Sequence, residues 1–314
     1  MNLKLQITVF LSVMIYLSSI CYGEDLILPA FLPTDAKHAN WSFSGLVTNE
    51  SGDLYSYFFE MQRDGQQYQI YSALFDGQTK KPIFIEQDSA IIEQPNVYNW
   101  RVGRAFLRFN PINDSWIFGL TTADKKGFNF KVDMLNQSTS NYQVQKITSN
   151  ISFFITQTSH LNGHIYINSD KSEQFVMANQ AWFRQVWQIR SQQNLHPVTG
   201  LFCRFDDGHG FYSMNILEES ALQGAVTGAC DMQGNSIAIS QFINVTDLKN
   251  SNWHIDVTSP SHHLLLENLL DNPSLVAGFV SEKGHDGFCL LSNDLFYQST
   301  KTGLTENFNR STKE

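Results

Sequence analysis

Short segments in which apolar and polar residues alternate, separated by turn sequences, dominate this chain. Ala105–Phe109, Trp116–Leu120 and Phe128–Met134 each alternate with a period of two, as half-buried β-strands do. An aromatic-rich segment, Leu54–Met61, lies between Gly-Asp and Asp-Gly dipeptides that are typical of tight turns. A chain built from such segments is expected to fold into antiparallel sheets.

The same pattern continues through the second half of the chain, and long segments of helical periodicity are absent. Two short segments, Ser89–Gln94 and Leu269–Leu275, are candidates for helices or turns. Many short strands with frequent turns predict an all-β sandwich or barrel, and a barrel of about eight or more strands can enclose a small ligand. Further strands are predicted at Tyr68–Phe75, His164–Asn168, Gln174–Met177, Leu201–Phe205, Phe211–Leu217, Trp253–Val257, His263–Glu267 and Phe288–Leu291.

Tryptophans recur at related spacings in the two halves of the chain. Trp41 and Trp182 are 141 residues apart, and Trp116 and Trp253 are 137 residues apart. A spacing near one domain length is typical of a tandem duplication rather than of a short solenoid repeat. We therefore expect two domains and a flexible tail, over residues 24–150, 151–298 and 299–314.

The first 23 residues have the pattern of a secretory signal peptide. Lys4 supplies the positive charge, Ile7–Tyr16 is apolar, and Cys21-Tyr22-Gly23 offers a cleavage site before Glu24. The alternative, a membrane anchor, needs about 20 apolar residues, and this apolar run is far shorter. We therefore expect a secreted or periplasmic protein with no integral membrane segment in the mature chain. The formal net charge of −9 argues against nucleic acid as a partner.

Three cysteines remain after removal of the predicted signal, so at least one has no partner within the chain. Cys203 and Cys230 flank a predicted hairpin and could form a disulfide in an oxidising compartment. Alternatively, these two and Cys289 are three small core residues. Cys-x-x-Cys spacing is absent, and His160 and His164 lie on a strand-rich segment rather than on one helical face. We expect neither a metal site nor a cofactor.

One stretch of the chain combines an aromatic pair, threonines, a glycine and two tryptophans in an order that resembles a known family. These residues are Phe153, Phe154, Thr156, Thr158, Gly163, Trp182 and Trp187. At the front of the chain, residues 38–43 (His-Ala-Asn-Trp-Ser-Phe) resemble that family's His-x-Glu-Trp-Trp-Tyr opening, and residues 205–208 resemble one of its hairpins. The chain is similar to the AttH-like family that includes the carotenoid 1,2-hydratases. This resemblance covers nearly the whole mature chain and implies two tandem lipocalin-like antiparallel β-barrel or sandwich domains.

The chain departs from this family at polar positions. Arg184 replaces the acidic residue between the two tryptophans, Asn40 replaces the glutamate of the opening motif, and Ser42 replaces its second tryptophan. A C-terminal Gly-Tyr-x-Glu element has become Gly-Phe-Cys-Leu at residues 287–290. The resemblance implies a hydratase that protonates an alkene with a carboxylic acid, whose pKa an apolar pocket raises. Arginine stays charged and is a poor proton donor, so we expect a degenerate catalytic motif, no catalytic residues and no hydratase activity.

Six residues are the candidates for a ligand-binding site. If residues 182–187 are extended, Trp182 and Arg184 share one face and Trp187 points to the other. The tryptophans would form an aromatic wall, and Arg184 would anchor an anionic head group such as a carboxylate. The alternative is a pair of core tryptophans with a surface or interdomain arginine. The candidates are Trp182, Arg184, Gln185 and Trp187, with Trp41 and His38 added by the resemblance alone.

We expect structural rather than functional roles for several other histidines and acidic residues. Asp206, Asp207 and His209 lie on a predicted hairpin tip, where we expect a solvated turn. His262 and His263 are adjacent on a predicted strand and should therefore point to opposite faces.

Three functions remain open. The leading hypothesis is a secreted lipocalin-like protein that binds an apolar or amphipathic small molecule, with affinity from buried aromatic area. The alternative is a lyase or isomerase acting on a polyene, terpenoid or lipid-like substrate. It would need a buried carboxylate facing Trp182, and the candidates are Asp133, Glu173 and Glu267. The third is a non-enzymatic interaction protein whose barrels are filled by side chains.

Overall fold

The structure is a computed structural model. It describes residues 36–96, 98–134, 145–147, 151–158, 160–167, 173–188, 198–218, 221–232, 236–237, 243–247, 252–258, 261–270 and 275–292. Internal contacts divide the chain into Met1–Leu32 and Pro33–Glu314, and every element described below belongs to the second unit. The predicted signal peptide (1–23) and tail (299–314) lie outside the described residues. Within these ranges no helix is long and apolar enough to cross a membrane.

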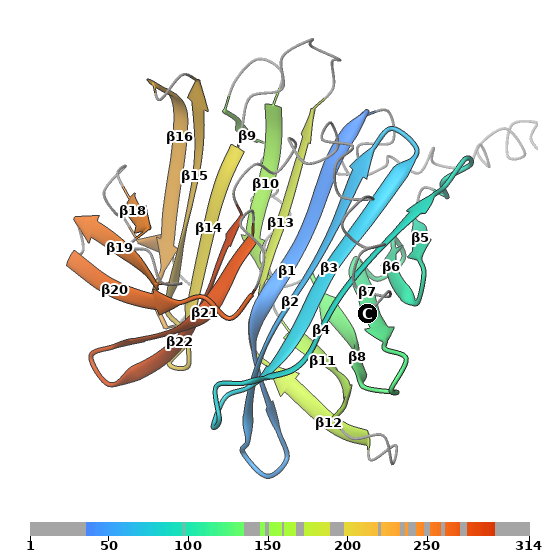
Figure 1. The fold of residues 1–314 in the computed structure, drawn as a ribbon, viewed down its shortest axis with the longest axis horizontal. Coiled ribbons are helices and arrows are strands. Elements are labelled where there is room, and N and C mark those ends of the chain that lie inside the picture. Colours follow the sequence, from blue (N-terminus) through green and yellow to red (C-terminus); the bar gives the residue numbers. More distant parts are fainter. Residues whose placement is uncertain are drawn as a thin grey trace, which may run out of the picture. The chain divides into compact units, whose positions relative to one another are not determined.

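Antiparallel strands in three sheets make up the described part of the chain (Figure 1). The largest sheet has 13 strands in the order β4-β3-β2-β1-β12-β11-β8-β7-β6-β5, with β13 paired to β1, β10 to β13 and β9 to β10. β5 also lies against β3 and β4, so the two ends of this path meet and the sheet forms a nearly closed barrel. Its strands are β1 (His38–Asn49), β2 (Leu54–Asp64), β3 (Gln67–Asp76), β4 (Pro82–Ile91), β5 (Asn99–Val102), β6 (Ala105–Asn110), β7 (Ser115–Thr121), β8 (Gly127–Asp133), β9 (Gln145–Lys146), β10 (Ile151–Gln157), β11 (His160–Tyr166), β12 (Glu173–Ala178) and β13 (Trp182–Gln188).

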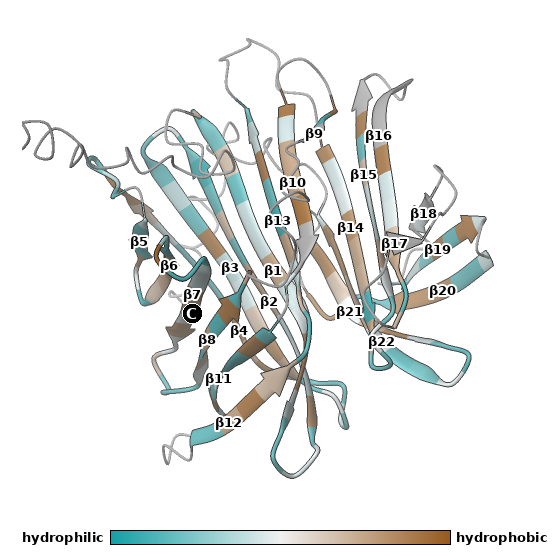
Figure 2. Ribbon diagram, turned by 180° about the vertical axis from the view of Figure 1, so that it is seen from behind, coloured by the Kyte–Doolittle hydropathy of each residue, from teal (hydrophilic) through white to brown (hydrophobic). Residues whose placement is uncertain are grey.

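Aromatic side chains fill the interior of this barrel. Phe43 on β1 stacks on Phe118 and Phe183, with ring centres 4.2 and 4.7 Å apart. Phe128 stacks on Phe130 at 4.4 Å. Hydrophobic and hydrophilic residues alternate along individual strands (Figure 2), so one set of side chains points inward and the other outward.

The other two sheets follow in the second half of the chain. The six-stranded sheet has the order β17-β16-β15-β14-β22-β21, the three-stranded sheet has the order β18-β19-β20, and β20 lies against β21. Their inner faces share one core, in which Leu264 and Leu266 of β20 pack with Leu201 and Val276. The strands are β14 (Val198–Phe205), β15 (Gly210–Glu218), β16 (Ala221–Cys230), β17 (Ser236–Ile237), β18 (Ile243–Asp247), β19 (Asn252–Thr258), β20 (Ser261–Glu267), β21 (Leu275–Glu282) and β22 (His285–Ser292).

The barrel and the six-stranded sheet pack against each other through β1, β2 and β3. Leu46 and Phe58 join a core cluster with Phe288 and Leu290 of β22. The opposite face of β1 carries Phe43 into the barrel. Because both faces are covered, ten successive residues of β1 are buried.

The all-β prediction is confirmed. The candidate helix at Ser89–Gln94 does not form, because β4 continues to Ile91. Most of the second candidate, Leu269–Leu275, lies outside the described residues; Leu269 and Leu270 are not helical, and β21 begins at Leu275. The division into domains at residue 150 stays a prediction. β11, which follows residue 150, pairs with β8, which precedes it, within the same sheet.

The structure matches neither of the two alternatives that the sequence left open for the three cysteines. Cys203 bonds to Cys289 rather than to Cys230, which is a buried free thiol. Cys203 and Cys289 are direct cross-strand partners on β14 and β22, with Cα atoms 4.1 Å apart. The partner cysteine lies 86 residues further along the chain, on β22. The local hairpin pattern in the sequence does not reveal that β14 and β22 are neighbours.

Candidate functional site

The predicted ligand-binding residues lie on the adjacent strands β1 and β13, but on two different faces. Successive side chains alternate between faces, and directly opposed residues of paired strands share one face. By the register of β1 and β13, His38, Trp182 and Arg184 share one face, and Trp41, Gln185 and Trp187 share the other. All six side chains are buried. The structure therefore brings the six residues together as two groups separated by the sheet.

Arg184 lies in a buried polar cluster between the barrel and the six-stranded sheet. Its guanidinium donates hydrogen bonds to Glu60 Oε2 at 2.9 Å and Asn40 Oδ1 at 3.3 Å, and it lies 4.7 Å from the ring centre of Phe202. The Ser292 hydroxyl donates to the same Glu60 oxygen at 3.1 Å. Burial lowers the pKa of Arg184 to about 10, against the opposing effect of Glu60, so the group is charged at neutral pH. Glu60 already neutralises the residue expected to anchor an anionic ligand.

Among the described residues, Glu60 is the only acidic residue that is buried. The sequence analysis did not identify it as a candidate. None of the three acids suggested for catalysis is buried. Asp133 and Glu173 have side chains 26% and 49% exposed, and Glu267 is exposed. Glu60 belongs to an ordinary strand sequence, so only its placement opposite Arg184 distinguishes it.

Trp182 and His38 have partners within the protein. The Trp182 indole donates a hydrogen bond to the Cys203 carbonyl at 3.0 Å and packs edge-on against Tyr212. His38 Nδ1 lies 3.0 Å from Asp64. Burial lowers the pKa of His38, although the Asp64 carboxylate acts in the opposite direction. Both residues therefore have structural contacts that would hold them in place without a ligand.

Trp41 and Gln185 face the barrel interior, where Trp41 packs against Trp100 at 4.9 Å. Within the described part of the chain, the Trp41 indole nitrogen and both amide atoms of Gln185 have no hydrogen-bond partner. Such groups cost about 1–3 kcal/mol each when left unpaired. A water molecule or a polar ligand atom would offset that cost.

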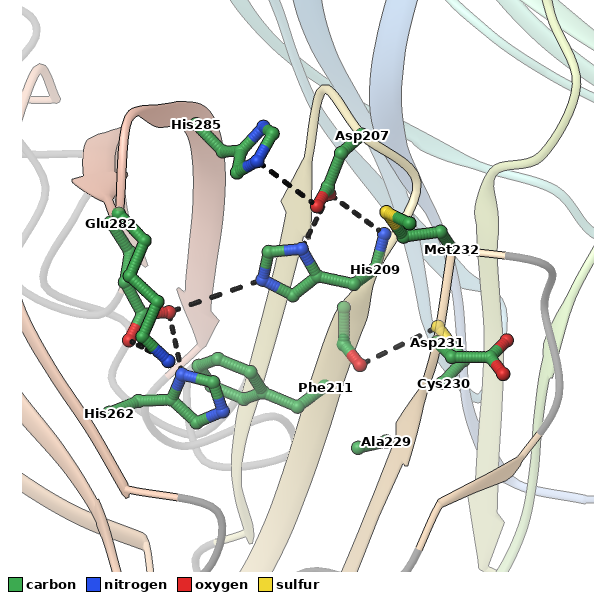
Figure 3. A pocket seen from close by; sticks show the side chains of 12 residues that line it. Asp207, His209, Phe211, Ala229, Cys230, Asp231, Met232, His262, Glu282 and His285 are labelled. Carbon is green, nitrogen blue, oxygen red and sulfur yellow. Dashed lines mark hydrogen bonds and ion pairs between the residues drawn. The ribbon is translucent and has the colours of Figure 1, made fainter.

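A cavity of about 360 Å³ lies elsewhere, at one end of the six-stranded sheet (Figure 3). Its walls come from the β14–β15 turn, from β15 and β16, from β20 and from the β21–β22 hairpin. We call it the histidine pocket. It is lined by Asp207, His209, Gly210, Phe211, Ala229, Cys230, Asp231, Met232, His262, Glu282, Lys283 and His285.

Two histidine–carboxylate pairs meet in the histidine pocket (Figure 3). His209 Nδ1 is hydrogen-bonded to Asp207, and His262 Nδ1 lies 2.6 Å from Glu282 Oε2. His209 Nε2 lies 4.0 Å from the same Glu282 oxygen, so Glu282 stands between the two imidazoles. Each carboxylate orients its imidazole through Nδ1, and both histidines line the cavity. This arrangement can accept and donate protons at two places in one pocket.

Asp207 is held as a carboxylate. Burial alone would raise its pKa, but hydrogen bonds from the His209 backbone and side chain, with the charges of His209 and His285, lower it below its ordinary value. His285 Nε2 lies 3.6 Å from Asp207 Oδ2. His209 is also fixed by stacking on Phe205, with ring centres 4.1 Å apart. Asp207 can therefore act as a constant hydrogen-bond acceptor that positions His209.

Cys230 lines the pocket but is not a reactive thiol. Burial raises its pKa to about 11, although Arg204 acts in the opposite direction. Its sulfur lies 3.5 Å from the Gly210 carbonyl oxygen. Since the thiolate is the nucleophilic form, Cys230 serves as part of the pocket wall.

The structure corrects the solvated-turn interpretation of Asp207 and His209. Their side chains are only 13% and 21% exposed, because the β21–β22 hairpin covers the turn. His262 and His263 do point to opposite faces, with side chains 11% and 68% exposed. Because adjacent strand residues face opposite ways, the sequence already implied that one of these two histidines points inward and could line a pocket. No sequence signal links it to Glu282, because the two come from separate strands.

Two groups of histidine and aspartate side chains in the described residues have donor atoms close enough to share a cation. Asp206, Asp207 and His285 form one group at the edge of the histidine pocket. His254, Asp256 and His263 form the other, on the β19–β20 hairpin.

Comparison with known proteins identifies the fold. No family model and no curated protein matched the sequence. An AttH-type protein of Nitrosomonas europaea matched the structure with a TM-score of 0.58 and 12% identity, covering 82% of this chain and 93% of the other. Kievitone hydratase from Nectria haematococca matched with a TM-score of 0.56 and 10% identity, covering 87% and 94%. CghA, in a complex with Sch210972, matched with a TM-score of 0.50 and 10% identity, covering 83% and 88%. The expected resemblance is confirmed at the level of structure: this chain has the AttH-type, lipocalin-like β-barrel fold.

Proposed function

We propose that this protein binds an apolar or amphipathic small molecule in the histidine pocket and acts on it by proton transfer, as a lyase or isomerase. The observation that carries the proposal is the pair of oriented imidazoles, His209 with Asp207 and His262 with Glu282, in one cavity. Catalysis by proton transfer needs an acid and a base held in fixed positions. A purely structural role for these residues would not require them to face a cavity.

The size and lining of the cavity support an apolar or amphipathic ligand. Its volume of about 360 Å³ falls within the range of about 300–1,000 Å³ that is usual for small-molecule sites. Phe211, Ala229 and Met232 supply apolar contacts, and the imidazoles supply polar ones. An apolar body with one or two hydroxyl or carbonyl groups would match this lining.

Two reactions fit two imidazoles in one pocket. In a hydration, a protonated imidazole gives its proton to one alkene carbon, and the other imidazole takes a proton from the water whose oxygen bonds to the second carbon. Proton exchange with solvent then restores both groups. In an isomerisation, one imidazole removes a proton from carbon, and the other returns a proton further along the conjugated system. Neither reaction needs a redox partner.

The known proteins with this fold support the lyase class, since one of them is named kievitone hydratase. Another was crystallised with the small molecule Sch210972. The Cys203–Cys289 disulfide supports the proposed secreted or periplasmic location, because disulfides persist in oxidising compartments.

The test is deuterium incorporation from D₂O. The purified protein would be incubated with a panel of polyenes, terpenoids and phenolic alkenes, and the products analysed by mass spectrometry. Uptake of deuterium at carbon, or of D₂O across a double bond, is expected. His209→Gln and His262→Gln should each reduce the rate by about 10²–10⁴-fold.

The control is His164→Gln, which alters an exposed histidine beside Glu173 on the barrel. It should leave the rate unchanged. Binding without deuterium uptake would reject the catalytic step and leave a carrier of small molecules. Equal rates for the protein and both pocket variants would reject the histidine pocket as the site.

A further inference from the structure

The β19–β20 hairpin places two histidines and an aspartate together on its outer face. Asp256 on β19 is directly opposed to His263 on β20, and His254 lies two residues before Asp256, on the same face. The alternate residues Ile255 and Leu264 are buried in the core beneath. Because that core fixes which face points inward, the three polar side chains are held on the outside.

The distances between their donor atoms suit a metal ion. His254 Nε2 lies 3.4 Å from Asp256 Oδ1, and His263 Nδ1 lies 2.6 Å from the same oxygen. In a tetrahedral zinc site with bonds of about 2.0–2.2 Å, ligand atoms lie roughly 3.2–3.6 Å apart. The first distance already matches. The second needs an opening of about 0.6–1.0 Å to reach this range, which His263 can supply because its side chain is 68% exposed.

The hydrogen bonds around His263 also favour its use as a metal ligand. Its other ring nitrogen, Nε2, lies 3.3 Å from the Ser261 hydroxyl, which leaves Nδ1 directed at Asp256. Histidine ligands of metals usually make such a hydrogen bond through the second ring nitrogen, because it sets the tautomer. Exposed ion pairs contribute only about 0–1 kcal/mol, so stability alone gives little reason to gather these three side chains.

We propose that His254, Asp256 and His263 bind one divalent transition-metal ion of the zinc class on the outer face of the β19–β20 hairpin. Two imidazole nitrogens and one carboxylate oxygen suit zinc, copper or nickel, whereas calcium and magnesium prefer sites made of oxygen. Three protein ligands leave at least one position for water or for a donor from another molecule. The ion links β19 to β20, the strand whose opposite face carries His262 into the histidine pocket.

The experiment is equilibrium dialysis of the full chain against zinc chloride, with metal analysis, followed by titration with Co²⁺. One bound equivalent should be lost in the His254→Ala/His263→Ala double variant, and each single variant should bind at least about tenfold more weakly. The bound Co²⁺ should give the visible spectrum of a nitrogen–oxygen site without thiolate bands, which excludes Cys230 as a ligand. Circular dichroism would check that the variants fold, as expected because the side chains of His254 and His263 are 40% and 68% exposed.

Two controls separate this site from other histidines. His164→Ala removes a histidine that lies 3.4 Å from Glu173 and that belongs to neither of the two donor groups found among the described residues, and it should retain the bound ion. His285→Ala removes the histidine of the other donor group, at the histidine pocket, and should also retain it. Unchanged zinc retention in the double variant, or loss only in His285→Ala, would overturn the proposal. The proposed catalytic function depends on different residues and is tested by the pocket variants alone.

Discussion

At the scale of single residues, buried polar side chains distinguish this protein from a barrel held together by apolar contacts alone. Arg184 and Glu60 form an ion pair with side chains 1% and 2% exposed, within a buried polar cluster that also contains Asn40 and Ser292. Two guanidinium nitrogens of Arg184, Nε and Nη1, have no hydrogen-bond partner in the described residues. A buried ion pair of this kind contributes little net stability compared with well-packed apolar residues of similar volume.

Removing one member of the pair should cost more than removing both. Arg184→Met should lower the free energy of unfolding by about 3–5 kcal/mol, because Glu60 is left buried without its ion-pair partner. The double variant Glu60→Met/Arg184→Met should recover most of this loss, since apolar residues of similar volume often replace buried ion pairs without penalty. Urea unfolding measures both. An equal loss in the single and double variants would show that the charges are not coupled.

The disulfide is a second residue-scale contribution. The bond joins Cys203 to Cys289, which are 86 residues apart in the sequence. In the chain-entropy model, closing a loop of that size in the unfolded chain stabilises the folded protein by roughly 4–5 kcal/mol. Cys203→Ala/Cys289→Ala should lower the free energy of unfolding by about 2–5 kcal/mol, measured by urea unfolding. Cys230→Ala in the same assay should show a much smaller change, because its thiol is unpaired. If the two variants behaved alike, the bond would not constrain the unfolded chain.

At the scale of elements, glycines allow strands to approach closely where the sheets meet. A Cβ atom added to Gly278 on β21 would lie 1.9 Å from the Glu267 carbonyl oxygen of β20. By contrast, a Cβ at Gly45 on β1 would meet Ala181 and Tyr57 at 3.5 Å, an ordinary contact distance. Gly278 is therefore required by backbone proximity and not by a turn conformation.

Gly278→Ala should destabilise the protein by about 1–3 kcal/mol, because the backbone of β20 or β21 must move to accept the methyl group. Thermal unfolding would measure the change, with Gly45→Ala as the matched control on a strand. The same movement would displace His262 on β20, so Gly278→Ala should also weaken ligand binding in the histidine pocket. A fully stable Gly278→Ala protein would show that β20 and β21 can separate freely.

At the scale of the whole molecule, stability should decrease as the pH falls in two stages. The pKa of His38 is lowered by burial, so its stabilising contribution is fully present above its unfolded value of about 6.5 and is lost as the pH falls below it. The pKa of Asp207 is also lowered, so its contribution is present above about 3.8 and lost below that pH.

Urea unfolding between pH 8 and 3 would separate the two stages. His38→Gln should abolish the change that begins near pH 6.5 and leave the acid stage intact. Asp207→Asn should affect only the lower stage and, because it releases His209, should also reduce activity in the pocket. A free energy of unfolding that stays constant from pH 8 to 5 would contradict the role assigned to His38.

The sequence by itself determined the elements of this protein. Period-two alternation at segments such as Phe128–Met134 specified strands, since that spacing buries one face of a sheet. It also predicted that His262 and His263 would face opposite ways. The tertiary structure alone decided which strands are neighbours, and with them the Cys203–Cys289 bond, the Arg184–Glu60 pair and the histidine pocket. The physical reason is that alternation fixes where a side chain points, whereas its partner depends on pairings between strands far apart in the chain.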